Sequence, residues 1–279
     1  MLWSVAAHGR SAMTIAPTFS ESTPTSFESE RDAELERELG RAWRGTEARM
    51  AAWDLEAARA DYLDRDQLLI RPDAFAPADL ARMASAAERL RPEVVRRRLP
   101  GYKKSGSVSH AGVRAAAPEL DALYRSPRLV ETLSSVAGVR LEPCPAWDLH
   151  ACALYYYTEP GDFVGWHFDS SHYRGERYTV LVGIVNSPTQ SRLECRLYEK
   201  IPAHEKVELS VSTEPGTLVF FNGDRLWHSV SKLGEGEERI VLTLEYVTDP
   251  RMSPLRRVMS DFKDSVAYFG FGRRSRGGA

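Results

Sequence analysis

The order of local patterns along the chain predicts an α+β fold, with helices first and a jelly roll of antiparallel strands after them. Residues 31–139 are dominated by stretches with helical spacing of apolar side chains, whereas residues 140–250 contain short segments rich in Val, Ile, Leu, Tyr and Thr, separated by turn residues. Several short strands at such spacing are typical of a sandwich or jelly roll and not of alternating strand–helix units.

The helical half contains three amphipathic patterns. Residues 31–63 are rich in Glu, Arg, Ala and Leu, residues 77–90 place apolar side chains on one face, and residues 118–137 begin at Pro118 and are followed by Gly138. Proline at the start and glycine after the end are common helix boundaries. Residues 1–30 are rich in Ser, Thr and Pro, so we expect a disordered N-terminal segment before a single catalytic domain over residues 31–279.

The strand-like segments follow in the second half of the chain. Residues 251–279 follow them, with a final amphipathic helix expected over residues 253–268. Within this C-terminal part, residues 261–271 are the candidate for a lid that closes over the pocket. We therefore expect a jelly-roll core over residues 140–250, with strands in residues 150–158, 177–186, 192–199, 206–211, 216–222 and 239–247.

Composition narrows the class of protein. The 279 residues include 37 basic and 39 acidic side chains, for a net charge of -2, and no aromatic-basic groove is evident, so a nucleic-acid partner is not expected. No apolar run is long enough to span a membrane, and the first residues make a poor signal peptide. Three cysteines without a paired pattern fit the reducing cytoplasm. Oligomeric state and the true start, Met1 or Met13, remain open.

A metal site is indicated by His167, Asp169 and His228. In an extended segment, residues two apart project to the same face, so His167 and Asp169 can point together into the sandwich. His228 follows a strand-like segment and the turn 222–224, and it supplies a third ligand. Two histidines and one carboxylate occupy one face of an octahedron and leave three positions open, as in non-haem iron oxygenases.

A binding site for 2-oxoglutarate is indicated by Arg239 and Tyr157. Arg239 begins the strong strand pattern of residues 239–246, 11 residues after His228. A guanidinium there can hold the distal carboxylate of the keto acid with a two-pronged, charge-assisted bond. Tyr157, in the run 155–157, can donate a phenol hydrogen bond to the same carboxylate. These two residues predict 2-oxoglutarate as co-substrate.

Four residues are candidates for substrate contacts. His172 and Arg177 follow the ligand motif, Asn222 lies in the turn before His228, and Arg114 lies in a Gly/Ser-rich stretch over residues 105–114. A mobile loop without a ligand role is the alternative reading of that stretch.

On these residues the sequence resembles the iron(II)/2-oxoglutarate-dependent oxygenase superfamily, whose double-stranded β-helix carries His-x-Asp, a distal His and a following Arg. The resemblance is strongest to bacterial oxygenases that hydroxylate or halogenate free amino acids, and it covers residues 140–270. It implies Fe(II), 2-oxoglutarate and O2 as cofactor and co-substrates, and a small-molecule substrate, a free amino acid above all.

The resemblance also bears on the reaction. Halogenases of this branch replace the ligand carboxylate by Gly or Ala, whereas this chain has Asp169, which favours hydroxylation. Lysine-acting relatives place an acid after the ligand motif, whereas this chain has Ser170 and Ser171, which argues against lysine. A desaturase, a cyclase, a halogenase, a demethylase of protein or nucleic acid and a non-catalytic cupin-like metal-binding module are the alternatives.

Overall fold

The protein is described by a computed structural model that covers residues 41–187 and 190–252. The expected disordered segment, residues 1–30, and the expected C-terminal helix, residues 253–268, lie outside the described residues. No helix within the described ranges is both long and apolar enough to cross a membrane.

The core is one strongly folded antiparallel sheet of twelve strands. Along the sheet the order is β1-β10-β7-β12-β5-β3-β6-β11-β8-β9, with β2 beside β3 and β4 beside β12. The strands are β1 (Leu68–Arg71), β2 (Val95–Leu99), β3 (Lys103–Val108), β4 (Glu142–Pro143), β5 (Cys152–Tyr157), β6 (Phe163–His167), β7 (Arg177–Ser187), β8 (Leu193–Leu197), β9 (Val207–Val211), β10 (Leu218–Asn222), β11 (Trp227–Val230) and β12 (Glu238–Val247).

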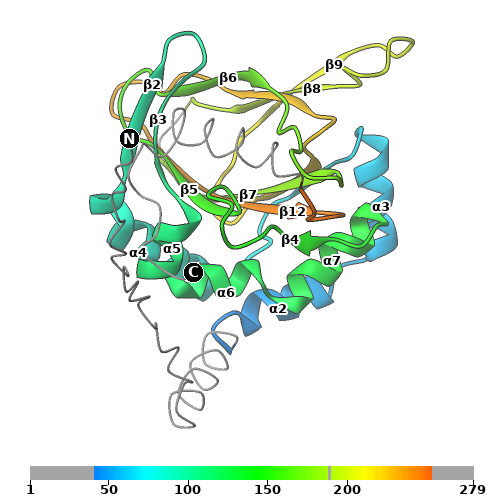
Figure 1. Ribbon diagram of the computed structural model, residues 1–279, viewed down its shortest axis with the longest axis horizontal. Helices are drawn as coiled ribbons and strands as arrows, with labels where there is room; N and C mark the ends of the chain where they lie inside the picture. The colour runs from blue at the N-terminus through cyan, green and yellow to red at the C-terminus, as the bar shows by residue number, and fades with distance from the viewer. Residues whose placement is uncertain (1–40, 188–189, 253–279) are drawn as a thin grey trace, which may run out of the picture. The chain divides into compact units, whose positions relative to one another are not determined.

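Strand β3 joins the two halves of this sheet because it pairs with β5 on one side and with β6 on the other. The half formed by β7, β12 and β5 faces the half formed by β6, β11 and β8 (Figure 1). This arrangement is the predicted jelly roll, and the six strand segments expected from the sequence are confirmed.

Alternation along β12 divides the sheet into two faces with different surroundings. Ile240, Leu242 and Leu244 belong to the main hydrophobic cluster, together with buried side chains from the helices. The intervening residues, which begin with Arg239 and end with Glu245, line a cavity between the two halves of the sheet. Successive side chains of a strand point to opposite faces, so one strand contributes to both the core and the cavity.

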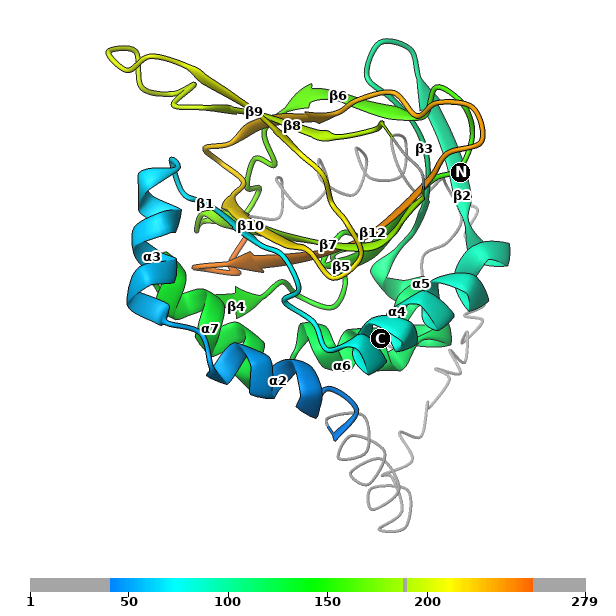
Figure 2. The ribbon, with the colours of Figure 1, turned by 180° about the vertical axis from the view of Figure 1, so that it is seen from behind.

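A layer of helices covers the face of β5, β7 and β12 that points away from the cavity (Figures 1 and 2). Capping side chains start three of them, because Asp54, Ser109 and Ser126 accept hydrogen bonds from backbone N–H groups in the first turn of α3, α5 and α7. The helices are α2 (Arg44–Ala51), α3 (Leu55–Asp64), α4 (Pro77–Leu90), α5 (His110–Ala116), α6 (Pro118–Tyr124) and α7 (Pro127–Ala137), with a short 3-10 turn, η1 (Arg91–Glu93).

Two details differ from the sequence predictions. The helix expected over residues 118–137 is divided into α6 and α7, because Ser126 adopts a non-helical capping conformation before Pro127. The half expected to be mainly helical, residues 31–139, also contains β1, β2 and β3. Strands β2 and β3 were not predicted because their sequences, Val-Arg-Arg-Arg-Leu and Lys-Lys-Ser-Gly-Ser-Val, are too polar to resemble buried strands.

Candidate active site

His167, Asp169 and His228 converge at one end of the cavity, as predicted. His167 and His228 are direct partners in the pairing of β6 with β11, and Asp169 follows β6 by two residues. Asp169 Oδ1 lies 3.3 Å from His167 Nε2, and Asp169 Oδ2 lies 3.6 Å from His228 Nε2. One ligand atom from each side chain lies within 4.8 Å of the other two, which is compatible with a single metal ion.

Backbone contacts orient both imidazole rings toward that point. His167 Nδ1 lies 2.8 Å from Gly165 O, and His228 Nδ1 lies 3.1 Å from Leu226 O. A carbonyl accepts only from a protonated nitrogen, so each Nε2 keeps its lone pair for a metal. Burial and the neighbouring His167 lower the pKa of His228 to about 4, which keeps this imidazole neutral at pH 7. The donor set fits a divalent first-row metal such as iron(II).

The chain after Asp169 is held by the turn before β11. Asp224 accepts hydrogen bonds of 3.0 Å from the backbone N–H of Ser171 and of Arg177, and its own N–H donates to Asn222 Oδ1. A Cβ on Gly223 would lie 2.8 Å from the Asp169 Cβ, so only glycine permits this approach. The turn therefore fixes the main chain that presents the ligand carboxylate.

Arg239 and Tyr157 lie side by side in the pairing of β12 with β5. The guanidinium carbon of Arg239 lies 5.0 Å from the centre of the Tyr157 ring, and Arg239 Nε donates to Thr213 Oγ1 at 3.0 Å. Arg239 is 1% exposed, and no carboxylate of the described ranges forms an ion pair with it. A buried cation without a negative partner is costly, so an anionic ligand is expected here.

The cavity connects the three ligands with Arg239 and Tyr157. Its wall combines apolar side chains with imidazole, phenol and hydroxyl groups, as is usual for a small-molecule site. The lining residues are Tyr102, His150, Tyr155, Tyr157, Val164, His167, Phe168, Asp169, Ser170, His172, Arg177, Thr179, Leu181, Leu193, His228, Val230, Arg239, Val241, Thr243 and Glu245.

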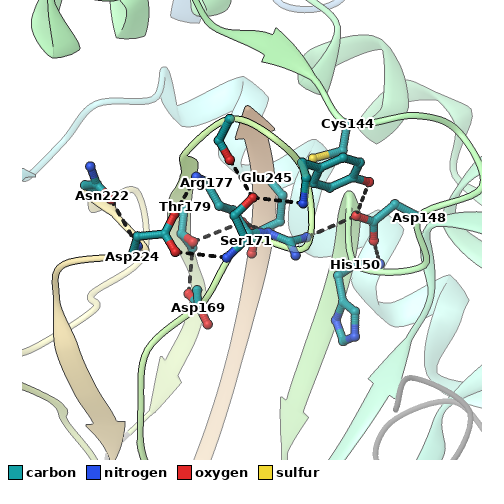
Figure 3. A network of polar contacts seen from close by, with 12 residues as sticks. Cys144, Asp148, His150, Asp169, Ser171, Arg177, Thr179, Asn222, Asp224 and Glu245 are labelled. Atoms are coloured by element: carbon teal, nitrogen blue, oxygen red, sulfur yellow. Dashed lines mark hydrogen bonds and ion pairs between the residues drawn. The ribbon is translucent and has the colours of Figure 1, made fainter. Parts of the chain in front are cut away.

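A buried polar network lies against the metal end of the cavity (Figure 3). Thr179 Oγ1 lies 2.9 Å from Asp169 Oδ2 and 2.9 Å from Glu245 Oε2. Arg177 donates from Nε to Glu245 at 3.0 Å and from a terminal nitrogen to Asp148 at 3.1 Å. Burial raises the pKa of Glu245 to about 8 despite this arginine, so the protonated form is favoured at neutral pH.

Comparison with known proteins decides the family. The model of the family described as HalD, Halogenase D, matches residues 80–258, more than half of the chain. The chain belongs to the Halogenase D family. No curated protein matches the sequence.

Solved structures show the same fold at low sequence identity. The 2-oxoglutarate-dependent epimerase SnoN from nogalamycin biosynthesis has a TM-score of 0.57 and 20% identity, over 69% of this chain and 81% of that one. AviO1 from Streptomyces viridochromogenes Tue57 has a TM-score of 0.53 and 21% identity, over 72% and 97%. A prolyl hydroxylase from Trichoplax adhaerens has a TM-score of 0.55 and 12% identity, over 85% and 98%. The fold expected from the resemblance to the iron(II)/2-oxoglutarate oxygenases is confirmed.

Seven of the nine site residues chosen from the sequence line the cavity. Six of them lie as expected, and the seventh, Arg177, lines the cavity with its guanidinium paired to acids. The six are His167, Asp169, His228, Arg239, Tyr157 and His172.

Asn222 and Arg114 do not line the cavity. Asn222 is fully buried in the turn that carries Asp224, and it donates to Gln67 Oε1 at 2.9 Å. Arg114 lies on α5, half-exposed, 3.8 Å from Asp121. The Gly/Ser-rich stretch that contains it is not a mobile loop, because its first part forms β3 and its remainder begins α5.

Sequence reasoning missed Thr179 and Glu245. Alternation along each strand could have revealed both residues. Thr179 lies two residues after Arg177 and Glu245 lies six residues after Arg239, and an even separation places both members of each pair on the cavity face of the same strand. An acidic side chain within an otherwise apolar strand pattern was the stronger of the two signals.

Proposed function

We propose that the chain is an iron(II)- and 2-oxoglutarate-dependent oxygenase that hydroxylates an unactivated C–H bond of a small molecule, a free amino acid or a close derivative. The observation that carries this proposal is one cavity lined both by a His–Asp–His ligand set and by the buried Arg239, which forms no ion pair with an acid of the described residues. A cupin-like module that only binds a metal has no need for a buried arginine such as Arg239 in the same cavity.

The residues divide the binding work between them. His167, Asp169 and His228 would hold the iron, and Arg239 with Tyr157 would bind the distal carboxylate of 2-oxoglutarate. Bound together, iron(II) and 2-oxoglutarate supply the activation of O2. Burial raises the pKa of Tyr157, so its phenol keeps the proton that it would donate to the carboxylate.

Asp169 supports hydroxylation over halogenation. The family takes its name from a halogenase, and halogenation is therefore the second candidate function. A chloride ion needs a coordination position of its own, and a carboxylate ligand fills the position that halogenases of this branch leave open by Gly or Ala. The carboxylate oxygens of Asp169 lie 3.3 Å from His167 Nε2 and 3.6 Å from His228 Nε2, close enough to bind the same metal, so chloride would have to displace Asp169.

The cavity wall supports a polar, non-cationic substrate. Away from Arg239, the wall includes the polar side chains of Tyr102, His150, Tyr155 and His172. Within the described ranges, the carboxylates that line the cavity are those of Asp169, the metal ligand, and of Glu245, which accepts from Arg177. No further acid of residues 41–187 or 190–252 lines the cavity to bind a lysine-like ammonium group, in agreement with Ser170 and Ser171 after the ligand motif.

The test is a mass-spectrometric screen of free amino acids with iron(II), ascorbate, chloride and 2-oxoglutarate. We expect a product heavier by one oxygen, with succinate formed in equal amount, and no product with His167→Ala. A chlorinated product would replace hydroxylation by halogenation. Succinate without any modified amino acid would contradict the substrate class, and full activity of His167→Ala would contradict the metal site.

The compartment is part of the same proposal. The three cysteines are buried and free of disulfides, which suits the reducing cytoplasm. Fractionation of cells that express the full chain would test this placement.

A further inference from the structure

Asp169 has two carboxylate oxygens, and the site has a use for only one of them as a ligand. An octahedral metal held by two histidines and one carboxylate oxygen keeps three positions open. Two of these are needed by the keto acid chelate and one by O2, under the proposed function. If both oxygens of Asp169 bound the metal, one of those positions would be lost.

Thr179 contacts one of the two oxygens and not the other. Both oxygens lie near a ligand nitrogen, Oδ1 3.3 Å from His167 Nε2 and Oδ2 3.6 Å from His228 Nε2, but the Thr179 Oγ1 contact of 2.9 Å is made with Oδ2. Hydrogen bonds to carboxylate ligands orient them and are a common control of metal sites. Oδ1 is therefore the oxygen left for coordination.

The position of Thr179 is fixed from two sides. In the sheet it lies between Phe221 of β10 and Glu245 of β12. Its hydroxyl also lies 2.9 Å from Glu245 Oε2, and Glu245 is in turn held by Arg177 at 3.0 Å. Thr179 and Glu245 are 1% and 5% exposed, so both are shielded from bulk solvent.

The backbone around Asp169 is fixed independently of Thr179. Asp224 binds the backbone N–H groups of Ser171 and Arg177, and Gly223 packs against the Asp169 main chain. Rotation of the Asp169 side chain is thus the freedom that remains, and the Thr179 hydroxyl is placed to control it (Figure 3).

We propose that Thr179 is a positioning residue, whose hydroxyl holds Oδ2 of Asp169 away from the metal and so limits this ligand to one oxygen. The proposal rests on the proposed function, because it presupposes a metal bound by His167, Asp169 and His228. It assigns Glu245 the task of holding Thr179 in place.

The test uses cobalt(II) as a redox-stable probe of the iron site, with the full-length protein. Thr179→Val removes the hydroxyl and keeps the shape, whereas Thr179→Ser keeps the hydroxyl. Thr217→Val is the matched control, since Thr217 is a buried threonine, 4% exposed, that does not line the cavity. Cobalt(II) is titrated to saturation by visible absorption, and 2-oxoglutarate is then titrated into the loaded protein.

We expect Thr179→Val to weaken 2-oxoglutarate binding at saturating cobalt(II) by about tenfold or more, the usual size of such effects. Thr179→Ser and Thr217→Val should stay within about threefold of the wild type. Binding by Thr179→Val within about threefold of the wild type would overturn the proposal, as would an equal loss in Thr179→Ser. A wild type that binds no cobalt(II) would instead remove the proposed function itself, so the two failures are distinguishable.

Discussion

Arg177 and Arg239 lie on the cavity face of the neighbouring strands β7 and β12, yet their guanidinium groups have different partners. Arg177 donates to Glu245 at 3.0 Å and to Asp148 at 3.1 Å. Arg239, which is 1% exposed, donates to the neutral Thr213 at 3.0 Å and forms no ion pair with an acid of residues 41–187 or 190–252.

The difference distinguishes a buried charge that stabilises the fold from a buried charge that is available to bind a ligand. The charge of Arg177 is balanced inside the protein, so removal of the arginine leaves two buried carboxyl groups without their partner. No acid of the described residues balances the charge of Arg239, so removal of this arginine leaves none of them without its partner. A buried cation of the second kind is the expected mark of a site for an anionic ligand.

The largest effect should come from Arg177→Met. Loss of this guanidinium leaves Asp148 without its cationic partner and Glu245 with only the Thr179 contact, and breaking a buried pair costs about 3–5 kcal/mol of unfolding free energy. Urea denaturation measures it. Arg114→Met is the control, because Arg114 is half-exposed at the surface and should change the free energy by less than about 0.5 kcal/mol. A cost below about 1 kcal/mol for Arg177→Met would remove the contrast between the two arginines.

Arg239→Met should reverse the pattern, with a large loss of binding and a small loss of stability. Unfolding free energy should fall by about 1–2 kcal/mol, because the hydrogen bonds of Arg239 to Thr213 and to Tyr157 are lost. Binding of 2-oxoglutarate should weaken by about 1.5–3 kcal/mol, or about 10- to 150-fold, because a charge-assisted bond is lost. Titration of the cobalt(II)-loaded protein measures the affinity. Destabilisation as severe as that of Arg177→Met would show that Arg239 is structural.

The charge state of Glu245, a partner of Arg177, makes the stability of the buried cluster depend on pH. Burial raises the pKa of Glu245 from 4.5 to about 8, so the folded protein holds this proton more tightly than the unfolded chain does. Stability from this group is complete below about pH 4.5 and is lost as the pH rises toward about 8, by up to about 1.4 kcal/mol per pH unit.

Glu245→Gln should remove that dependence. The amide is neutral at every pH, so the unfolding free energy of the variant should fall less between about pH 5 and about pH 8 than that of the wild type. Urea denaturation of both proteins at several pH values, with a chelator present, provides the measurement. Parallel pH profiles of the two proteins would mean that Arg177 keeps Glu245 ionised, and that the buried cluster carries a different charge.

The sequence was sufficient to predict the parts that depend on local pattern. The strand containing Arg239 was visible because its apolar residues are continuous, and the ligand pair His167 and Asp169 was visible because residues two apart share a face of an extended chain. The antiparallel jelly roll followed from the spacing of such segments.

The parts that depend on distant partners were not predictable in this way. Arg96 in β2 reads as solvated surface charge, yet it pairs with the fully buried Asp162 at 2.6 Å, 66 residues along the chain. Likewise, Arg177 was expected to contact substrate, and only the tertiary structure reveals Asp148 and Glu245 beside it. Charge and residue type do not disclose whether a counter-charge arrives from elsewhere in the fold.

The smallest effect should come from Tyr157→Phe, which tests whether the tyrosine helps Arg239 to bind the keto acid. The ring 5.0 Å from the Arg239 guanidinium carbon is retained, and only the phenol donor is lost. We expect 2-oxoglutarate binding to weaken by about 1 kcal/mol, or about fivefold, the value of one neutral hydrogen bond.

The neighbouring residue provides the control for this change. Tyr156 points to the opposite face of β5, where its hydroxyl donates to Ala87 O at 2.8 Å. Tyr156→Phe should therefore lower the unfolding free energy by about 1 kcal/mol and leave 2-oxoglutarate affinity unchanged. Equal affinities for the two variants would confine keto acid recognition to Arg239. A loss of 2-oxoglutarate affinity in Tyr157→Phe alone would instead show that Tyr157 and Arg239, which are partners in the pairing of β12 with β5, bind the keto acid together.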